Sequence, residues 1–140
     1  MATTATIKVK DQDLLASLKA FCVTLLEQEN ISAILVPQRL PMKAMVMPVL
    51  VSDPEKLKGI DPLAPAFALN AAKVVSKLTR KPTSEKIAVM LRPCEIRAFV
   101  ELVKLHQGRR DEVLIVGSDC LGAYTNKAYL AFAEACGESS

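Results

Sequence analysis

The feature that most constrains the fold is a strand, helix, strand pattern in the second half of the chain. Ile87 to Leu91 is a short apolar run, Cys94 to Gln107 carries apolar residues at helical spacing, and Val113 to Val116 is a second apolar run. We expect Gly108 to end the helix as its carboxyl cap. Two strands joined by a helix within about 30 residues form a βαβ unit, whose strands are normally parallel. The pattern therefore predicts an α/β fold.

The first half of the chain adds elements of both kinds. Apolar residues at spacings of three and four predict a helix that Asp11 or Asp13 could cap, with Cys22 packed on its apolar face. Pro37 is expected to end the first of two apolar runs that could be adjacent strands. The remaining predicted elements are strands at Ile31 to Val36 and Ala44 to Val51, a helix at Phe67 to Leu78 with Leu69 facing inward, and a last helix at Asn126 to Cys136.

Length and composition agree with this class of fold. The 140 residues suit one domain, 1–140, and no composition shift divides them. Hydrophobic residues make up 51% of the chain but aromatic residues only 4%, so Ala, Val, Leu, Ile and Met must build the core. Such a core suits helices on a parallel sheet better than a β-sandwich. We expect a single α/β domain with a mainly parallel sheet of about four strands and flanking helices.

Charge and hydropathy exclude two classes of partner. The net charge is +3, and the basic residues are scattered without stacking aromatics among them, which argues against nucleic-acid binding. No run reaches the roughly 18 apolar residues that a membrane span requires. The first residues lack the apolar run of a signal peptide, so we expect a cytoplasmic protein with reduced cysteines.

Two of the four cysteines follow the two strands of the βαβ unit. Cys94 comes directly after the first strand, and Cys120 comes directly after the second. Parallel strands place both turns at the carboxyl edge of the sheet, where open α/β sheets bind ligands. No pair of cysteines has C-x-x-C spacing, so a self-contained zinc or ferredoxin-type cluster is not expected. A thiol-bearing site shared by the two turns is the main functional prediction.

The first turn allows several kinds of chemistry. Pro93 suits the first position of a helix. The free N–H groups of that first turn would lower the pKa of the Cys94 thiol and so favour its thiolate form. The same helix start, flanked by Arg92 and Arg97, could instead hold an anion such as the phosphate of a nucleotide cofactor. Glu95 argues against an anion, because its carboxylate already offsets the helix dipole. The alternative is structural: Pro93 only starts the helix, Glu95 and Arg97 lie in solvent, and Cys94 packs.

The second turn is bounded by glycines. Gly117 and Gly122 flank Asp119 and Cys120, and they permit backbone conformations or close approaches that side chains forbid. A ligand could therefore come near the main chain here. The spacing differs from the G-x-G-x-x-G dinucleotide fingerprint. The alternative is a turn in which Asp119 caps the next segment.

Together the two turns resemble a known family. Residues 92–98, which include Pro-Cys-Glu-Ile-Arg-Ala, and the Asp-Cys-Leu-Gly turn at 119–122 are similar to motifs in β subunits of the coenzyme F-420 hydrogenase/dehydrogenase family, including formate dehydrogenase β subunits. The resemblance spans about residues 33–124 of the 140. It implies a flavoprotein that passes electrons between a deazaflavin coenzyme or similar carrier, FAD and an iron–sulfur cluster, inside a larger hydrogenase or formate dehydrogenase complex.

The resemblance also assigns roles to the turns. Cys94 and Cys120 align with the two turn cysteines of the family, as iron–sulfur ligands or as neighbours of the flavin. Family members are commonly longer, with cysteine-rich segments, so a truncated or split member is expected here, with other subunits of a redox complex as partners and self-association left open. No catalytic residue is assigned. Two alternatives remain: a non-catalytic scaffold or assembly domain of a split redox complex, and a thiol-based redox protein acting through Cys94.

Overall fold

One four-stranded sheet forms the centre of the protein. The computed structural model describes residues 4, 6–40, 45–66, 69–120 and 122–136. The strands are β1 (Ile31–Leu40), β2 (Met45–Val51), β3 (Lys86–Leu91) and β4 (Val113–Gly117), in the order β2-β1-β3-β4. β1 pairs with β3, and β3 with β4, in parallel, whereas β1 and β2 are antiparallel. The expected α/β fold with a mainly parallel sheet of four strands is confirmed.

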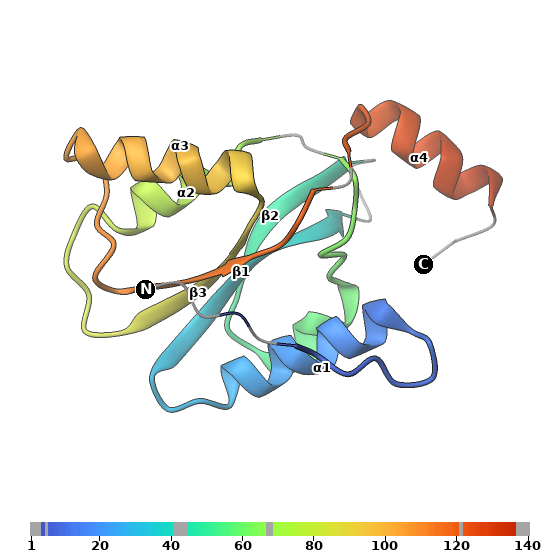
Figure 1. The fold of residues 1–140 in the computed structure, drawn as a ribbon, viewed down its shortest axis with the longest axis horizontal. Coiled ribbons are helices and arrows are strands. Elements are labelled where there is room, and N and C mark those ends of the chain that lie inside the picture. The colour runs from blue at the N-terminus through green and yellow to red at the C-terminus, as the bar shows by residue number, and fades with distance from the viewer. Residues whose placement is uncertain (1–3, 5, 41–44, 67–68, 121, 137–140) are drawn as a thin grey trace.

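Helices cover both faces of this sheet (Figure 1). α2 (Ala71–Leu78) and α3 (Pro93–Lys104) pack on one face, around a cluster that contains the fully buried Phe99. α1 (Leu14–Leu26) and the 3-10 helix η1 (Pro54–Gly59) pack on the other, and α4 (Asn126–Ala135) contacts β2 at the side of the molecule. None of the helices in the described segments is long and apolar enough to cross a membrane.

The first helix forms as its sequence predicts. The carboxylate of Asp13 caps α1 by accepting a hydrogen bond of 2.9 Å from the N–H of Ala16. Cys22 lies on the apolar face and is fully buried against the sheet. Burial disfavours the charged thiolate and raises the pKa of Cys22 to about 11. This cysteine is a core residue.

The first hairpin differs from the prediction at its prolines. We expected Pro37 to end the strand, but β1 continues to Leu40. Pro37 lies directly opposite Pro48 in the antiparallel ladder, so the two missing N–H donors fall at one place and the pairing resumes on both sides. Ala44 and Phe67, where we expected the second strand and a helix to begin, lie outside the described residues. α2 begins at Ala71, and Leu69 is 37% exposed rather than turned inward.

The end of α3 also differs from the prediction. The helix stops at Lys104, and His106 takes the left-handed conformation, with φ of 57°. The N–H of Gln107 donates to the carbonyl of Leu102 at 2.8 Å, and the N–H of His106 donates to Val103, as in a Schellman motif. His106 rather than Gly108 therefore occupies the position that usually favours glycine.

Candidate functional site at the carboxyl edge of the sheet

The two cysteine-bearing turns lie side by side in space. Leu91, the last residue of β3, is paired with Gly117, the last residue of β4. A hydrogen bond of 2.9 Å from the N–H of Ser118 to the carbonyl of Leu91 extends this pairing into the turns. Cys94 and Cys120 are each the third residue after this pair. The structure thus brings both turns to the same carboxyl edge, as the strand pattern predicts.

The first turn exposes its thiol. Pro93 occupies the first position of α3, and both Pro93 and Cys94 are exposed to solvent. Arg97 is also exposed, and its Nε donates to the carbonyl of Pro93 at 3.4 Å. The structural alternative in which Cys94 packs into the core is wrong. A metal ion, a cofactor atom or an oxidant can reach this sulfur.

Glu95 lies inside the protein, where its carboxylate joins two helix starts. One oxygen, Oε2, accepts a hydrogen bond of 3.0 Å from the N–H of Arg92, the cap residue of α3. The other oxygen, Oε1, accepts one of 3.1 Å from the N–H of Ala71, the first residue of α2. Glu95 is only 6% exposed, so the alternative that placed it in solvent is wrong. This carboxylate fixes the turn that carries Cys94.

Arg92 supports the same turn from the interior. Its side chain is buried, and Nη2 donates a hydrogen bond to the carbonyl of Ala64, in the segment that follows η1. Arg92 and Glu95 both line a small cavity of about 20 Å³ against β1 and β2. The space suits about one water molecule. Arg92 and Glu95, two of the predicted site residues, therefore hold the turn in place from the protein interior.

This arrangement bears on the predicted anion site. A helix start attracts a phosphate through its unpaired N–H groups and the positive end of its dipole. At α3 the carboxylate of Glu95 already accepts the N–H of Arg92 and places negative charge in the first turn. A phosphate would meet that charge, so the residues present do not fit the phosphate of a nucleotide cofactor at this helix start.

The second turn is exposed and depends on one glycine. Asp119 and Cys120 are both exposed, and the thiol of Cys120 donates to the carbonyl of Gly122 at 3.5 Å. Gly122 has a φ of +134°, which side chains rarely tolerate. At Gly117, in contrast, an added Cβ would meet its nearest neighbour at an ordinary 3.5 Å. Of the two flanking glycines, only Gly122 is required by the backbone.

Asp119 does not cap the last helix. The hydroxyl of Thr125 does so, by accepting a hydrogen bond of 3.2 Å from the N–H of Ala128. Asp119 therefore contributes an exposed carboxylate beside Cys120.

The set of thiols limits which cofactor could bind. Cys94 and Cys120 supply two exposed sulfurs at one edge, while Cys136 is exposed at the end of α4 and Cys22 is buried. Across the described ranges, no three or more His, Cys, Asp or Glu side chains form a group that could hold a metal ion. An iron–sulfur cluster usually takes four thiolates. The two exposed thiols could supply at most two of these four ligands.

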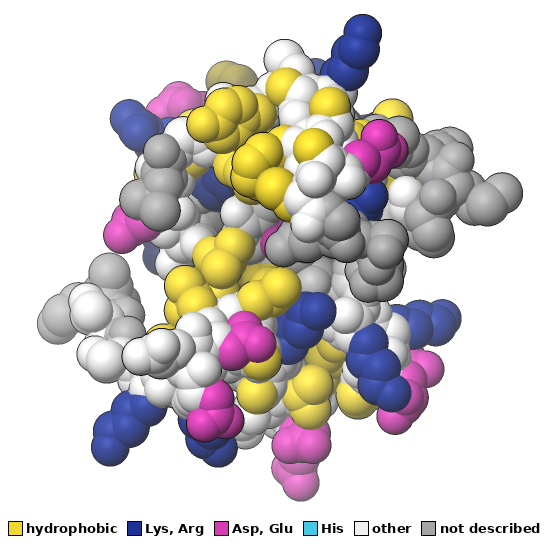
Figure 2. Space-filling model, turned by 90° about the vertical axis from the view of Figure 1, so that its right-hand side faces the viewer, with side chains coloured by type: hydrophobic (Ala, Val, Ile, Leu, Met, Phe, Trp, Pro, Cys, Tyr) yellow, Lys and Arg dark blue, Asp and Glu magenta, His cyan; other side chains and the backbone are white. Residues whose placement is uncertain are grey.

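An apolar pocket on the same side of the molecule was not predicted. The N–H of Tyr124 donates to the carbonyl of Pro65 at 2.6 Å, which ties the chain after Cys120 to the segment before α2. Tyr124 and Phe132 are each 65% exposed, and hydrophobic side chains gather on this face of the molecule (Figure 2). A pocket of about 400 Å³ lies here, lined by Pro65, Tyr124, Ala128, Tyr129 and Phe132.

Sequence signals existed for part of what was missed. Glu95 stands at the third position of the helix, where the glutamate of a capping box bonds the backbone of the cap residue. Although Arg92 replaces the usual Ser or Thr, this position could have placed Glu95 against the backbone of Arg92. The pocket has no comparable signal, because its residues come from two distant segments.

No family model matches the chain.

Proposed function

We propose that this chain is a redox component resembling the β subunit of a coenzyme F-420-dependent hydrogenase or formate dehydrogenase. In this role it helps to hold an iron–sulfur cluster, with FAD nearby, for electron transfer within a larger complex. The single observation that carries the proposal is the position of two exposed thiols, Cys94 and Cys120, in turns joined by the hydrogen bond between Ser118 and Leu91.

Cys94 and Cys120 would hold the cluster. Glu95 and Arg92 keep the first turn in position, and the left-handed Gly122 shapes the second. A bound cluster supplies one-electron transfer, while the protein residues position it and exclude competing reactions. Because the two turns contribute two thiolates, the remaining ligands would come from another subunit or another segment. This incomplete ligand set supports the proposal that the chain acts inside a complex.

The apolar pocket supports a place for the flavin. Tyr124 follows Cys120 by four residues, and its ring lines a pocket whose walls are mostly aromatic and apolar. Planar rings bind well between such side chains. The proposal therefore places the ring system of FAD at this pocket and keeps its phosphates away from α3, where Glu95 opposes them. Coenzyme F-420 would then be the exchangeable electron carrier, as the resemblance implies.

The visible absorption spectrum of the protein tests the proposal. The chain is purified without oxygen and reconstituted with iron, sulfide and FAD in excess dithiothreitol, whose thiolates can take the ligand positions that the two turns leave open, and bound iron and flavin are assayed. Cys94→Ser and Cys120→Ser are compared with the matched control Cys136→Ser, whose thiol is also exposed but lies at the carboxyl cap of α4. We expect a broad iron–sulfur absorption that either turn substitution abolishes and that the control retains.

Other outcomes separate the two alternatives. A protein that stays colourless after reconstitution would contradict the proposal and favour a scaffold or assembly domain. A colourless protein in which Cys94→Ser abolishes reversible oxidation by a disulfide, while Cys120→Ser does not, would favour a thiol-based redox protein.

A further inference from the structure

The net positive charge of the protein is concentrated in two stretches of the chain. Residues 73–86 and 109–112 together contain seven Lys and Arg and three Asp and Glu, a net charge of +4. The rest of the chain contains eleven Lys and Arg and twelve Asp and Glu, a net charge of −1. The excess of positive charge, which looks scattered along the sequence, therefore belongs to these two stretches.

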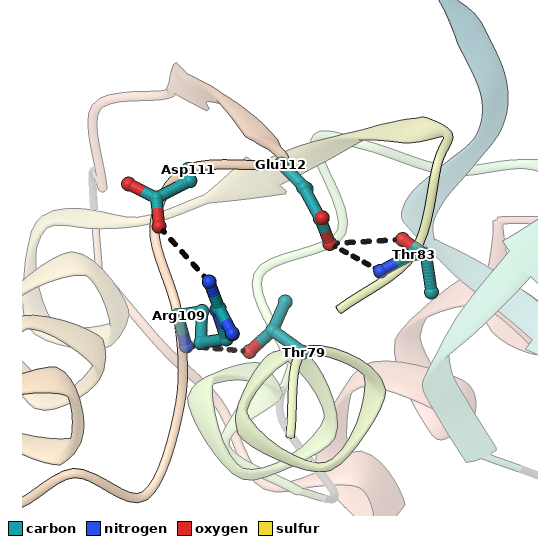
Figure 3. Close-up of polar contacts among 5 residues, drawn as sticks. All are labelled: Thr79, Thr83, Arg109, Asp111 and Glu112. Atoms are coloured by element: carbon teal, nitrogen blue, oxygen red, sulfur yellow. Dashed lines mark hydrogen bonds and ion pairs between the residues drawn. The ribbon is translucent and has the colours of Figure 1, made fainter. Parts of the chain in front are cut away.

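The fold brings the two stretches together at the carboxyl ends of α2 and α3. The N–H of Arg109 donates a hydrogen bond of 3.0 Å to the hydroxyl of Thr79, the cap residue of α2 (Figure 3). The hydroxyl of Ser76 donates to the carbonyl of Gln107. The two helices lie side by side, with their carboxyl ends at the same end of the molecule (Figure 1). We call the surface formed by residues 73–86 and 109–112 the basic surface.

Four cations of the basic surface have no acidic partner. No salt bridge joins any of them to an acid within the described part of the chain. All four are exposed: Lys73, Lys77, Arg80 and Lys81. Lys73 and Lys77 lie one turn apart on the outer face of α2, and like charges at this spacing repel each other. An acidic partner would relieve this repulsion.

Two of the three acids on the basic surface have partners within it. Asp111 pairs with Arg109 at 3.7 Å, and the carboxylate of Glu112 accepts two hydrogen bonds from Thr83 (Figure 3). The backbone N–H of Thr83 is the main reason that the pKa of Glu112 is lowered, with the hydroxyl of Thr83 and Arg109 adding to the effect. Glu112 keeps its negative charge, and the net charge of +4 already includes it together with Asp111 and the exposed Glu85.

A pocket with apolar walls opens beside these cations. Its volume is about 190 Å³, below the roughly 300–1,000 Å³ of small-molecule sites, so it suits a single side chain. Leu50, Leu78 and Ile87 line it from β2, α2 and β3. Glu85 and Glu112 also belong to its wall, and their negative charge disfavours an acidic side chain inside it. The side chain that fits this pocket is therefore apolar.

These features together select one kind of partner. Surfaces that bind single-stranded nucleic acids combine cations with stacking aromatics, and residues 73–86 and 109–112 contain no aromatic residue. A nucleic-acid duplex has no side chain to fill an apolar pocket. A helix that binds a membrane surface inserts its apolar face, whereas the apolar face of α2 packs inward, where Val75 is fully buried. Protein interfaces combine an apolar anchor in a pocket with a rim of complementary charge.

We infer that the basic surface docks an acidic segment of a protein partner. One apolar side chain of that segment would fill the pocket, and its acidic residues would lie against Lys77, Arg80 and Lys81. The basic surface lies at the amino ends of β3 and β4, whereas Cys94 and Cys120 follow the carboxyl ends of these strands. A partner docked here would leave both thiols accessible. The inference is independent of any bound cofactor.

Peptide binding, measured by fluorescence anisotropy, tests this inference. The probe is a fluorescein-labelled peptide with three glutamates on each side of one phenylalanine, and the full chain is titrated into it. We expect saturable binding whose Kd rises at least about tenfold between about 50 and about 300 mM NaCl, because salt screens exposed charges. Replacement of the phenylalanine of the probe by alanine should raise the Kd at least about fivefold, because apolar burial is lost while every charge remains.

Two double variants locate the binding surface. Lys77→Glu with Lys81→Glu should raise the Kd at least about tenfold, because it places like charges opposite the glutamates of the probe. The matched control, Lys8→Glu with Lys56→Glu, makes the same change of net charge on exposed lysines elsewhere and should raise the Kd less than about threefold. Circular dichroism shows whether both double variants remain folded, and the comparison of the two probes needs only the wild-type chain.

Several outcomes would overturn the inference. They are an absence of peptide binding, an equal loss of binding in the two double variants, and an unchanged Kd when alanine replaces the phenylalanine of the probe. A short DNA duplex and phosphatidylserine vesicles are the competing probes. If either binds more tightly than the peptide, and Lys77→Glu with Lys81→Glu abolishes that binding, the partner is a nucleic acid or a membrane instead of a protein.

Discussion

Replacement of Glu95 should destabilise the protein far more than its place on an amphipathic helix suggests. The carboxylate accepts hydrogen bonds of 3.0 and 3.1 Å from two backbone N–H groups that begin different helices, and it is almost fully buried. In Glu95→Ala both N–H groups lose their acceptor in the interior.

The magnitude follows from these two bonds. A buried donor left without an acceptor costs about 1–3 kcal/mol, so two such donors would cost about 2–6 kcal/mol. Relief from burying the carboxylate offsets part of this cost, and we expect a net loss of about 2–4 kcal/mol. Glu95→Gln keeps one acceptor oxygen but turns an amide NH₂ toward the second N–H, so its loss should lie between wild type and Glu95→Ala. Total stabilities of about 5–15 kcal/mol make either change easy to measure.

Urea unfolding followed by circular dichroism at 222 nm gives the free energies. Glu101→Gln is the matched control, because Glu101 lies on the same helix and forms only an exposed pair with Lys104. That pair should be worth less than about 0.5 kcal/mol. If Glu95→Ala unfolds within 0.5 kcal/mol of Glu101→Gln, the bridging role of Glu95 is refuted.

Three further predictions concern other parts of the chain. In the native protein iodoacetamide should alkylate Cys94 but not Cys22, whose thiol should react only after unfolding; fast labelling of Cys22 would contradict its place in the core. Glu112→Gln should lower the melting temperature at pH 7. The pKa of Glu112 is lower in the folded protein than its ordinary value of 4.5, so the carboxylate stabilises the fold above pH 4.5 and loses this effect as the pH falls through the lowered pKa. An equal change in melting temperature at pH 2 would argue against this. An added Cβ at Gly108 would lie 3.2–3.3 Å from its neighbours, so Gly108→Ala should cost about 1–3 kcal/mol in urea unfolding, whereas Gly117→Ala should cost nothing measurable.

The sequence predicts the βαβ half of the fold well. Apolar runs at 87–91 and 113–116 have the length and composition of strands, and the helix between them has a clear apolar face, so local pattern and observed secondary structure agree. The same pattern places Cys94 and Cys120 in neighbouring turns. The pattern predicts the path of the backbone, and the positions of the two turns follow from that path.

Where the prediction failed, long-range pairing decided the outcome. Pro37 ends a strand only if its missing N–H leaves a partner unpaired, and the opposing Pro48 removes that penalty. From the local sequence Glu95 is expected to lie in solvent, but the start of α2 packs beside it and donates a hydrogen bond to its carboxylate. The pocket beside Tyr124 depends on the contact of two segments that are about 60 residues apart, as the hydrogen bond to Pro65 shows. Local sequence carries little information about such contacts.

Thiol protection on reconstitution is the most direct test of the claim that the two turns form one redox site. The chain is reconstituted without oxygen with iron, sulfide and excess dithiothreitol, which can supply the remaining ligands, and is then separated from unbound thiol and alkylated. Each cysteine is quantified by mass spectrometry. We predict that Cys94 and Cys120 become protected together and that Cys136 remains fully labelled. Labelling of Cys94 and Cys120 at the same rate as Cys136, or protection of only one of them, would contradict a shared site.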